Sequence, residues 1–259
     1  MKKTLDFIQN KLPKSPQSAV IIGSGLGGFI SQLRDPIHIP YADIPNFPES
    51  SVSGHVGEWV FGYINEKPII CANGRFHYYE GFSLDQVTLT VSISHSLGCS
   101  NLFITNAAGC LVQEWNLGDL MLIRGYLDYT FIKNSNSPSI VHLEQDSTFL
   151  SKLKKIALEN DINLREGIYT WTLGPTYETS AEIDDIISLG GTAAGMSTAP
   201  ELMKAQELKL NVIGISCLTN YGSGLQDETL THEAVLEISS KIQKKFSEFM
   251  KKIIQISPQ

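Results

Sequence analysis

Short apolar runs rich in β-branched residues recur along the chain, and they limit its possible fold more than any other feature. Each run is apolar almost throughout instead of alternating with polar residues, which is typical of strands that are buried on both faces of a sheet. The clearest runs span residues 19–22, 68–72, 102–105, 120–123 and 212–218. Such strands, alternating with helices, predict an α/β fold with a mixed, largely parallel central β-sheet flanked by helices.

Helix starts between these runs are marked by capping boxes, in which a Ser or Thr is followed three residues later by Glu or Gln. Boxes of this kind begin at Ser83, Thr179 and Thr198, and the third has a proline at a tolerated early position. An apolar stripe with helical spacing predicts a last helix over about 233–254. No linker, repeat or low-complexity tract interrupts the pattern, so we expect a single domain over residues 1–259.

The composition excludes several classes of protein. The 259 residues are 42% apolar and carry a net charge of −7, which is too apolar for a disordered chain and too acidic for a protein that binds mainly nucleic acid or an anionic membrane. No run of ~20 apolar residues is present, and polar residues after Leu5 interrupt any export signal. The four cysteines form no CxxC pair and no zinc-like cluster with histidine, so we expect no metal and a cytoplasmic location.

Polar residues follow the predicted strands, where open α/β sheets bind their ligands. A glycine loop around Ser24 follows the first strand, and its backbone N–H groups, with the start of a following helix, suit an anion. Arg75, His77 and Tyr79 follow the second run and are spaced by two, which places them on one face of an extended chain. With Ser197, these residues predict an oxyanion site. The alternatives are that the glycine loop is only a tight turn between a strand and a helix, and that Arg75 and His77 lie on a solvated edge.

The glycine loop also fits the G-x-G-x-x-G pattern of dinucleotide-binding sites, with Asp43 about 20 residues further on. An NAD-dependent oxidoreductase is therefore an alternative function. Two prolines argue against this alternative. Pro36 leaves only a very short crossover helix over residues 29–35, and Pro40 lies where the second strand of such a site should run.

Other residues near later strand ends suit a heterocyclic ligand. Asn220 follows the last apolar run and offers both a donor and an acceptor. Glu178 can accept ligand N–H groups, and Tyr177 beside it is a flat apolar neighbour. Both polar residues also have structural explanations, because Asn caps turns and Glu is favoured just before a helix. His55 and His232 lie in polar loops, where a single histidine is usually structural or solvated.

Together these segments resemble the trimeric purine nucleoside phosphorylases, which act on 6-oxopurine nucleosides. The matching segments are residues 21–28, 44–48, 54–57, 74–77, 79–81, 105–109, 118–123, 174–179, 195–198 and 219–220. The resemblance implies the fold of nucleoside phosphorylases, a cytoplasmic homotrimer, and a role in purine salvage. The implied reaction is phosphorolysis of inosine, guanosine and their 2′-deoxy forms to the base and (deoxy)ribose 1-phosphate, with inorganic phosphate as co-substrate and no cofactor.

The resemblance also implies roles for individual residues. Phosphate is held by Ser24, Arg75, His77, Ser197 and the backbone N–H of Ala107. The sugar is held by Tyr79, the backbone of Met196 and His232, with His55 near both the phosphate and the sugar. The base is held by Glu178 and Asn220, beside Tyr177. Catalytic roles are implied for His55, Glu178, Asn220 and His232; Asn220 donates to the base more strongly as the base gains negative charge.

The sequence departs from the family pattern in two regions. Residues 125–166 form a shorter region than in relatives, where it reaches the site of the neighbouring subunit, and Phe131 is a candidate substitute. The segment 221–230, which gates the base pocket in relatives, is also short. Two further alternatives are therefore open. One is a methylthioadenosine or adenosine phosphorylase, which has Asp at the position of Asn220 to accept from a 6-amino group, and the other is a non-catalytic nucleoside-binding protein.

Overall fold

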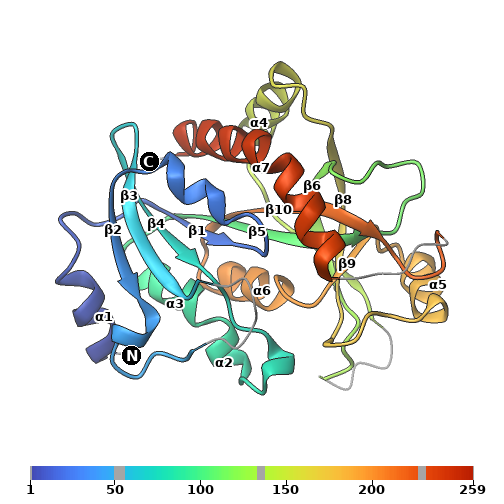
Figure 1. Ribbon diagram of the computed structural model, residues 1–259, viewed down its shortest axis with the longest axis horizontal. Coiled ribbons are helices and arrows are strands. Elements are labelled where there is room, and N and C mark those ends of the chain that lie inside the picture. The colour runs from blue at the N-terminus through green and yellow to red at the C-terminus, as the bar shows by residue number, and fades with distance from the viewer. Residues whose placement is uncertain (1, 50–55, 133–137, 227–231, 259) are drawn as a thin grey trace.

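All five apolar runs form strands in the computed structural model, which describes residues 2–49, 56–132, 138–226 and 232–258 (Figure 1). They lie in β1 (Ser18–Ile22), β4 (Lys67–Asn73), β5 (Asn101–Cys110), β6 (Leu120–Asp128) and β10 (Asn211–Tyr221). The other strands are β2 (Arg34–Pro40), β3 (Glu58–Ile64), β7 (Ile140–His142), β8 (Leu164–Trp171) and β9 (Ala193–Gly195). These strands belong to one mixed sheet, which confirms the predicted fold class.

Helices cover both faces of this sheet. They are α1 (Lys2–Gln9), α2 (Leu84–Val87), α3 (Leu89–Ser96), α4 (Ser147–Glu159), α5 (Ser180–Ser188), α6 (Ala199–Glu207) and α7 (His232–Gln255). Short 3-10 helices are η1 (Gly27–Gln32), η2 (Tyr41–Asp43) and η3 (Tyr78–Glu80). In Figure 1, α4 and α7 lie on one face of the sheet, and α3 and α6 lie on the other. No helix in the four described ranges is long and apolar enough to cross a bilayer.

The burial of β1 explains why its sequence is apolar without alternation. Ala19 and Ile21 pack into a cluster that contains residues of α3 and α6. Val20 and Ile22 point to the opposite face and pack with residues of α4 and α7. Because successive side chains of a strand point to opposite faces, a strand between two helical layers must be apolar at every position.

Strand direction determines which loops meet at one edge of the sheet. β5 pairs in parallel with β1 and with β10, and β1 pairs in parallel with β4. The carboxyl ends of these four strands therefore meet, as the sequence predicts. β8 differs, because it is parallel to β9, and β9 is antiparallel to β5. The loop after β8, which carries Glu178, therefore reaches this edge from the opposite direction.

The region after the glycine loop differs from the predicted helix over residues 29–35. η1 ends at Gln32, and β2 follows with Pro36 and Pro40 inside it. β2 lies at the edge of the sheet and, among the described strands, pairs only with β3. An edge strand tolerates proline because part of its backbone has no partner to lose. In a dinucleotide site, the strand that follows the glycine loop lies next to β1 and runs parallel to it. Here the two neighbours of β1 are β4 and β5, so β2 cannot take that position.

Two of the three predicted capping boxes are confirmed. Ser83 and Thr179 each accept a hydrogen bond from the backbone N–H three residues further on. The third prediction is wrong, because Thr198 precedes α6 but its side chain makes no capping bond. Glu201, which should complete that box, is buried against Arg75 instead. A tertiary ion pair has therefore replaced the local contact that the sequence pattern predicts.

Candidate active site

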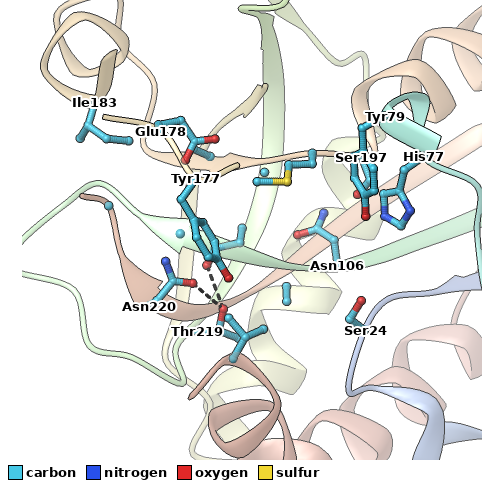
Figure 2. Close-up of a pocket in the computed structure, with 18 of the residues that line it drawn as sticks. Ser24, His77, Tyr79, Asn106, Tyr177, Glu178, Ile183, Ser197, Thr219 and Asn220 are labelled. Atoms are coloured by element: carbon cyan, nitrogen blue, oxygen red, sulfur yellow. Dashed lines mark hydrogen bonds between the residues drawn. The ribbon is translucent and has the colours of Figure 1, made fainter. Parts of the chain in front are cut away.

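A pocket with a cavity volume of about 140 Å³ opens at the edge where β1, β4, β5 and β10 end. The predicted site residues that line it are Ser24, Arg75, His77, Tyr79, Ala107, Tyr177, Glu178, Met196, Ser197 and Asn220. Figure 2 shows two groups of labelled side chains at its two ends. The first group, Ser24, His77 and Ser197, forms the arginine end together with Arg75, which lines the pocket and bonds to Ser197. The second group, Tyr177, Glu178, Thr219 and Asn220, forms the asparagine end.

Two predicted site residues are not placed by the structure. His55 lies outside the described residues. His232 is the first residue of α7, and its side chain also lies outside what the structure describes. Val235, three residues further along α7, lines the pocket. The start of α7 is therefore part of the pocket wall.

The glycine loop brings Ser24 to the arginine end because β1 and β5 are very close there. The backbone N–H of Gly23 donates to the hydroxyl of Thr105 at 3.0 Å. A side chain at Gly23 would place its Cβ atom 2.5 Å from the Cα atom of Asn106, so only glycine fits. The predicted helix start is not found here, since the loop leads into the six-residue 3-10 helix η1. Anion contacts from this loop therefore come from single N–H and O–H groups.

Arg75 is the central cation of the arginine end, and only 2% of it is exposed. Its Nη2 atom lies 3.3 Å from Oε2 of Glu201, a residue of α6 that is 1% exposed. Its Nη1 atom donates to the hydroxyl oxygen of Ser197 at 3.1 Å. Burial raises the pKa of Glu201, and the Arg75 charge opposes that rise. Because each buried charge is costly without the other, Glu201 fixes the direction in which Arg75 presents its donors.

His77 has a defined hydrogen-bond pattern. Its Nδ1 atom lies 3.1 Å from Oε1 of Glu80, and the same oxygen accepts the His77 backbone N–H at 2.8 Å. A carboxylate only accepts, so Nδ1 carries the hydrogen. Burial lowers the pKa of His77, which favours the neutral ring. In that state Nε2 is an acceptor for a protonated phosphate oxygen, and it becomes a donor only when the ring is protonated.

The amide of Asn220 has a fixed orientation at the asparagine end. Its Oδ1 atom accepts the hydroxyl of Thr219 at 3.0 Å, and its Nδ2 atom donates to the carbonyl oxygen of Tyr221 at 3.1 Å. Rotating the amide by half a turn would place two acceptors against each other at Tyr221. Because Nδ2 carries two hydrogens, one N–H is left for a ligand in the pocket that Asn220 lines.

Glu178 supplies an acceptor beside this donor. Its Oε1 atom is buried and has no hydrogen-bond partner among the described residues. A buried acceptor without a partner is costly, and a ligand N–H would remove that cost. Tyr177 and Ile183 line the same part of the pocket and give it an apolar wall. The asparagine end thus combines a donor, an acceptor and a flat apolar surface, which suits a heterocycle.

Several residues of this region have no role in the site predicted from the sequence. Asn106, Thr219 and Ile183 line the pocket, and Thr198 and Glu201 lie behind it. Asn106 and Thr219 lie near the carboxyl ends of parallel strands and within the matching segments 105–109 and 219–220, but no role in the site was predicted for them. One feature of the sequence could have indicated the role of Glu201, namely its position among apolar residues of α6. An acidic residue is almost never fully buried unless it is paired, so a buried cation was to be expected beside it.

Replacing Glu201 by glutamine should destabilise the fold, because the buried Arg75 guanidinium would lose its counter-charge. We expect the free energy of unfolding to fall by about 3 kcal/mol, near the lower end of the cost of breaking a buried pair. Urea unfolding followed by circular dichroism measures this change. Glu207→Gln on the same helix is the matched control, since Glu207 pairs with Lys204 at the surface and should have little effect. Equal midpoints for both variants would show that the Arg75 pair contributes nothing.

No group of three or more His, Cys, Asp or Glu side chains that could hold a metal ion occurs in the described ranges. All four cysteines are buried and free.

Comparison with known proteins identifies the family. The sequence profile of the phosphorylase superfamily matches residues 18–255. The chain is 39% identical to purine nucleoside phosphorylase 1 of Geobacillus stearothermophilus, over 98% of this chain and 96% of that protein. The chain belongs to the purine nucleoside phosphorylase family. It is also 35% identical to the purine nucleoside phosphorylase of Rattus norvegicus, over 99% of this chain and 94% of that protein.

Solved structures of the family support the same conclusion. A purine nucleoside phosphorylase of Schistosoma mansoni in complex with inosine superimposes with a TM-score of 0.89 at 30% identity, covering 100% of this chain and 96% of that one. The nucleoside phosphorylase fold is therefore confirmed over the described part of the chain. The pocket described above is the candidate active site of this family member.

Proposed function

We propose that this chain catalyses the phosphorolysis of purine nucleosides, with inosine and guanosine and their 2′-deoxy forms as preferred substrates. One observation carries the proposal: a single pocket joins a buried arginine with hydroxyl groups at one end to an oriented amide and a carboxylate at the other. The first end suits inorganic phosphate, and the second suits the polar edge of a 6-oxopurine. Membership of the family supports the same assignment.

Phosphate binds at the arginine end in this proposal. Arg75 presents its guanidinium, Ser24 and Ser197 present hydroxyls, and the backbone N–H of Ala107 adds a donor. His77 contacts a phosphate oxygen through Nε2. A phosphate oxygen attacks C1′ of the sugar while the bond from C1′ to N9 breaks. The electron pair of that bond stays on the purine, which takes up the proton that the phosphate loses, and the sugar leaves as ribose 1-phosphate or its deoxy form.

The base binds at the asparagine end. The free N–H of Asn220 donates to the N7/O6 edge, and Glu178 accepts from the N1–H of the purine. As the glycosidic bond breaks, the purine gains negative charge, so the hydrogen bond from Asn220 strengthens. An interaction that is stronger in the transition state than in the ground state raises the rate. Tyr177 packs beside the base.

The sugar lies between the two ends. We assign contacts with its hydroxyls to Tyr79, the backbone of Met196 and His232, with His55 near the phosphate and the sugar. The ring of Tyr79 stacks on His77 with 4.8 Å between ring centroids, which supports a position between phosphate and sugar. Catalytic roles for His55 and His232 stay predictions from the resemblance.

The alternatives have less support. Asn220 offers a donor where a 6-amino group needs an acceptor, which disfavours an adenosine or methylthioadenosine phosphorylase. The buried Arg75 and the oriented Asn220 disfavour a non-catalytic binding protein, since both ends needed for the reaction are present. The position of β2 at the edge of the sheet disfavours an oxidoreductase with a dinucleotide site after β1.

We also propose that the chain acts as a homotrimer in the cytoplasm, with residues 1–259 as one phosphorylase domain. Phe131 is our candidate for a residue that reaches a neighbouring subunit. It is 48% exposed and contacts Tyr129 edge-on, with 5.0 Å between ring centroids, so it presents a large apolar ring at the surface.

Base release from inosine, guanosine, adenosine and xanthosine, each with and without phosphate, tests the proposal. We expect release that depends on phosphate, and turnover of inosine and guanosine about 100-fold or more above that of adenosine, because a hydrogen-bonding site rejects a mismatched edge strongly. Ribose 1-phosphate should form in equal amount to the base. Release without phosphate, or faster release from adenosine, would contradict the assignment.

A further inference from the structure

Thr198 adopts a backbone conformation that its residue type rarely takes. Its φ is +66° and its ψ is −51°, which is the sterically unfavourable side for a β-branched residue. The backbone N–H of Ala199 donates to the carbonyl oxygen of Ser197 at 2.7 Å, so Thr198 is the central residue of a γ-turn of the rare, strained form. Strained residues of this kind persist where their surroundings fix them, and they cluster at functional sites.

The side chain of Thr198 lies in a buried hydrogen-bond network behind the arginine end. The residue is 0% exposed. Nδ2 of Asn106 donates to its hydroxyl oxygen at 2.9 Å, and Nη1 of Arg75 lies 3.5 Å from the same oxygen. Amide and guanidinium N–H groups can only donate. The Thr198 oxygen is therefore an acceptor in both contacts, and its own hydrogen must point elsewhere.

Two hydroxyl oxygens lie near that hydrogen, those of Ser197 and Tyr169. The oxygen of Ser197 lies 3.1 Å from the oxygen of Thr198, and it also accepts from Nη1 of Arg75 at 3.1 Å. When Thr198 donates to Ser197, two donors occupy the buried side of the Ser197 oxygen. Two directions are then open to its own hydrogen, the Tyr169 hydroxyl and the pocket that Ser197 lines. The backbone N–H of Ser197 is held by the hydroxyl of Tyr169 at 3.3 Å, so the residue is fixed from both sides.

We propose that Thr198 is a positioning residue that aims the hydroxyl hydrogen of Ser197 at the bound phosphate. It does so by accepting from Asn106 and donating to Ser197, while the γ-turn holds the two hydroxyls side by side. The inference deepens the proposed function and rests on phosphate as the anion of the arginine end. A hydroxyl whose hydrogen already points at a charged acceptor binds without reorganisation, and hydrogen bonds to ionised groups are among the strongest in proteins.

Two variants of Thr198 distinguish the effect of its hydroxyl group from the effect of its β-branched shape. Thr198→Val keeps the β-branched shape and removes only the hydroxyl. We expect it to raise the KM for phosphate by about 10- to 100-fold, the cost of losing a hydrogen bond to a charged group. The KM for inosine at saturating phosphate should change little. Thr198→Ser keeps the hydroxyl, so its KM for phosphate should stay near that of the wild type.

A third variant keeps the test decisive if the valine variant does not fold. Thr198→Gly adopts positive φ without strain and lacks the hydroxyl, so the same rise in the KM for phosphate is expected. The proposal is overturned if either variant without the hydroxyl retains the wild-type KM for phosphate. It is also overturned if the serine variant is as impaired as the valine variant, or if the KM values for inosine and phosphate rise equally.

The same assays distinguish this inference from the proposed function. Wild-type enzyme that releases no base in the presence of phosphate would contradict the proposed function. Wild-type enzyme that depends on phosphate, together with Thr198 variants of unchanged KM, would contradict only the role of Thr198.

Discussion

Replacing Arg75 by methionine is expected to reduce kcat/KM for phosphorolysis by about 100- to 1,000-fold, the effect of removing a donor aimed at developing or bound negative charge. The guanidinium is 2% exposed and donates to Ser197, so no water or neighbouring cation can replace it easily. Most of the loss should appear as a higher KM for phosphate, since Arg75 lies at the arginine end, away from Asn220. Initial rates at varied phosphate and saturating inosine measure this effect.

The single variant also leaves the Glu201 carboxylate buried without its partner, which could unfold the protein. A double variant removes this ambiguity. Arg75→Met combined with Glu201→Leu replaces the ion pair by apolar side chains, and such replacements of buried pairs are often neutral for stability. We expect the double variant to unfold near the wild-type midpoint and to stay as inactive as the single variant.

Arg34→Gln is the matched surface control. Arg34 pairs with Glu66 and Asp35 on side chains that are largely exposed, and it does not line the pocket. Its removal should leave both the activity and the unfolding midpoint unchanged. Wild-type affinity for phosphate in a folded Arg75→Met protein would show that phosphate binds elsewhere.

Replacing Asn220 by aspartate should change the preferred base. The new carboxyl group supplies an acceptor for a 6-amino group and removes the donor that a 6-oxopurine needs. We expect kcat/KM for inosine to fall by about 100-fold or more, and the ratio of adenosine to inosine turnover to rise. The carbonyl oxygen of Tyr221, 3.1 Å from Nδ2 in the native chain, would face a carboxyl oxygen instead. That contact disfavours the charged form, so the adenosine activity should be greater at low pH, where the carboxyl group is protonated and can donate to Tyr221.

Asn220→Ala separates the loss of a donor from the gain of an acceptor. It should lose inosine activity to a similar extent without any gain for adenosine. Parallel assays of both variants with inosine and adenosine, each at two pH values, make the comparison. Relative rates that stay the same in the aspartate variant would refute the role assigned to Asn220.

Much of the fold and of the candidate site could be predicted from local sequence. The five apolar runs form strands, and the capping boxes at Ser83 and Thr179 begin helices as expected. Ten predicted site residues line one pocket. The physical reason is that strand burial, helix capping and the position of polar residues after a strand depend on neighbours within a few residues along the chain.

The direction of β8, the edge position of β2 and the environment of Glu201 were not predictable in this way. Arg75 and Ser197 are 122 positions apart in the sequence, and yet they share a hydrogen bond. The capping-box prediction at Thr198 failed because Glu201 pairs with the buried guanidinium of Arg75 and the Thr198 hydroxyl accepts from Asn106. Interactions between residues that are far apart in the sequence produce no periodic pattern from which they could be predicted.

The sequence by itself determined the buried strands, most of the helix starts and the chemical types that gather after the strands, because each depends on the neighbours of a residue along the chain. Only the tertiary structure decided how those groups are oriented: which nitrogen of His77 carries the hydrogen, which way the Asn220 amide faces, and why Thr198 accepts a strained backbone. A hydrogen bond has direction, and that direction is set by partners that only folding brings together.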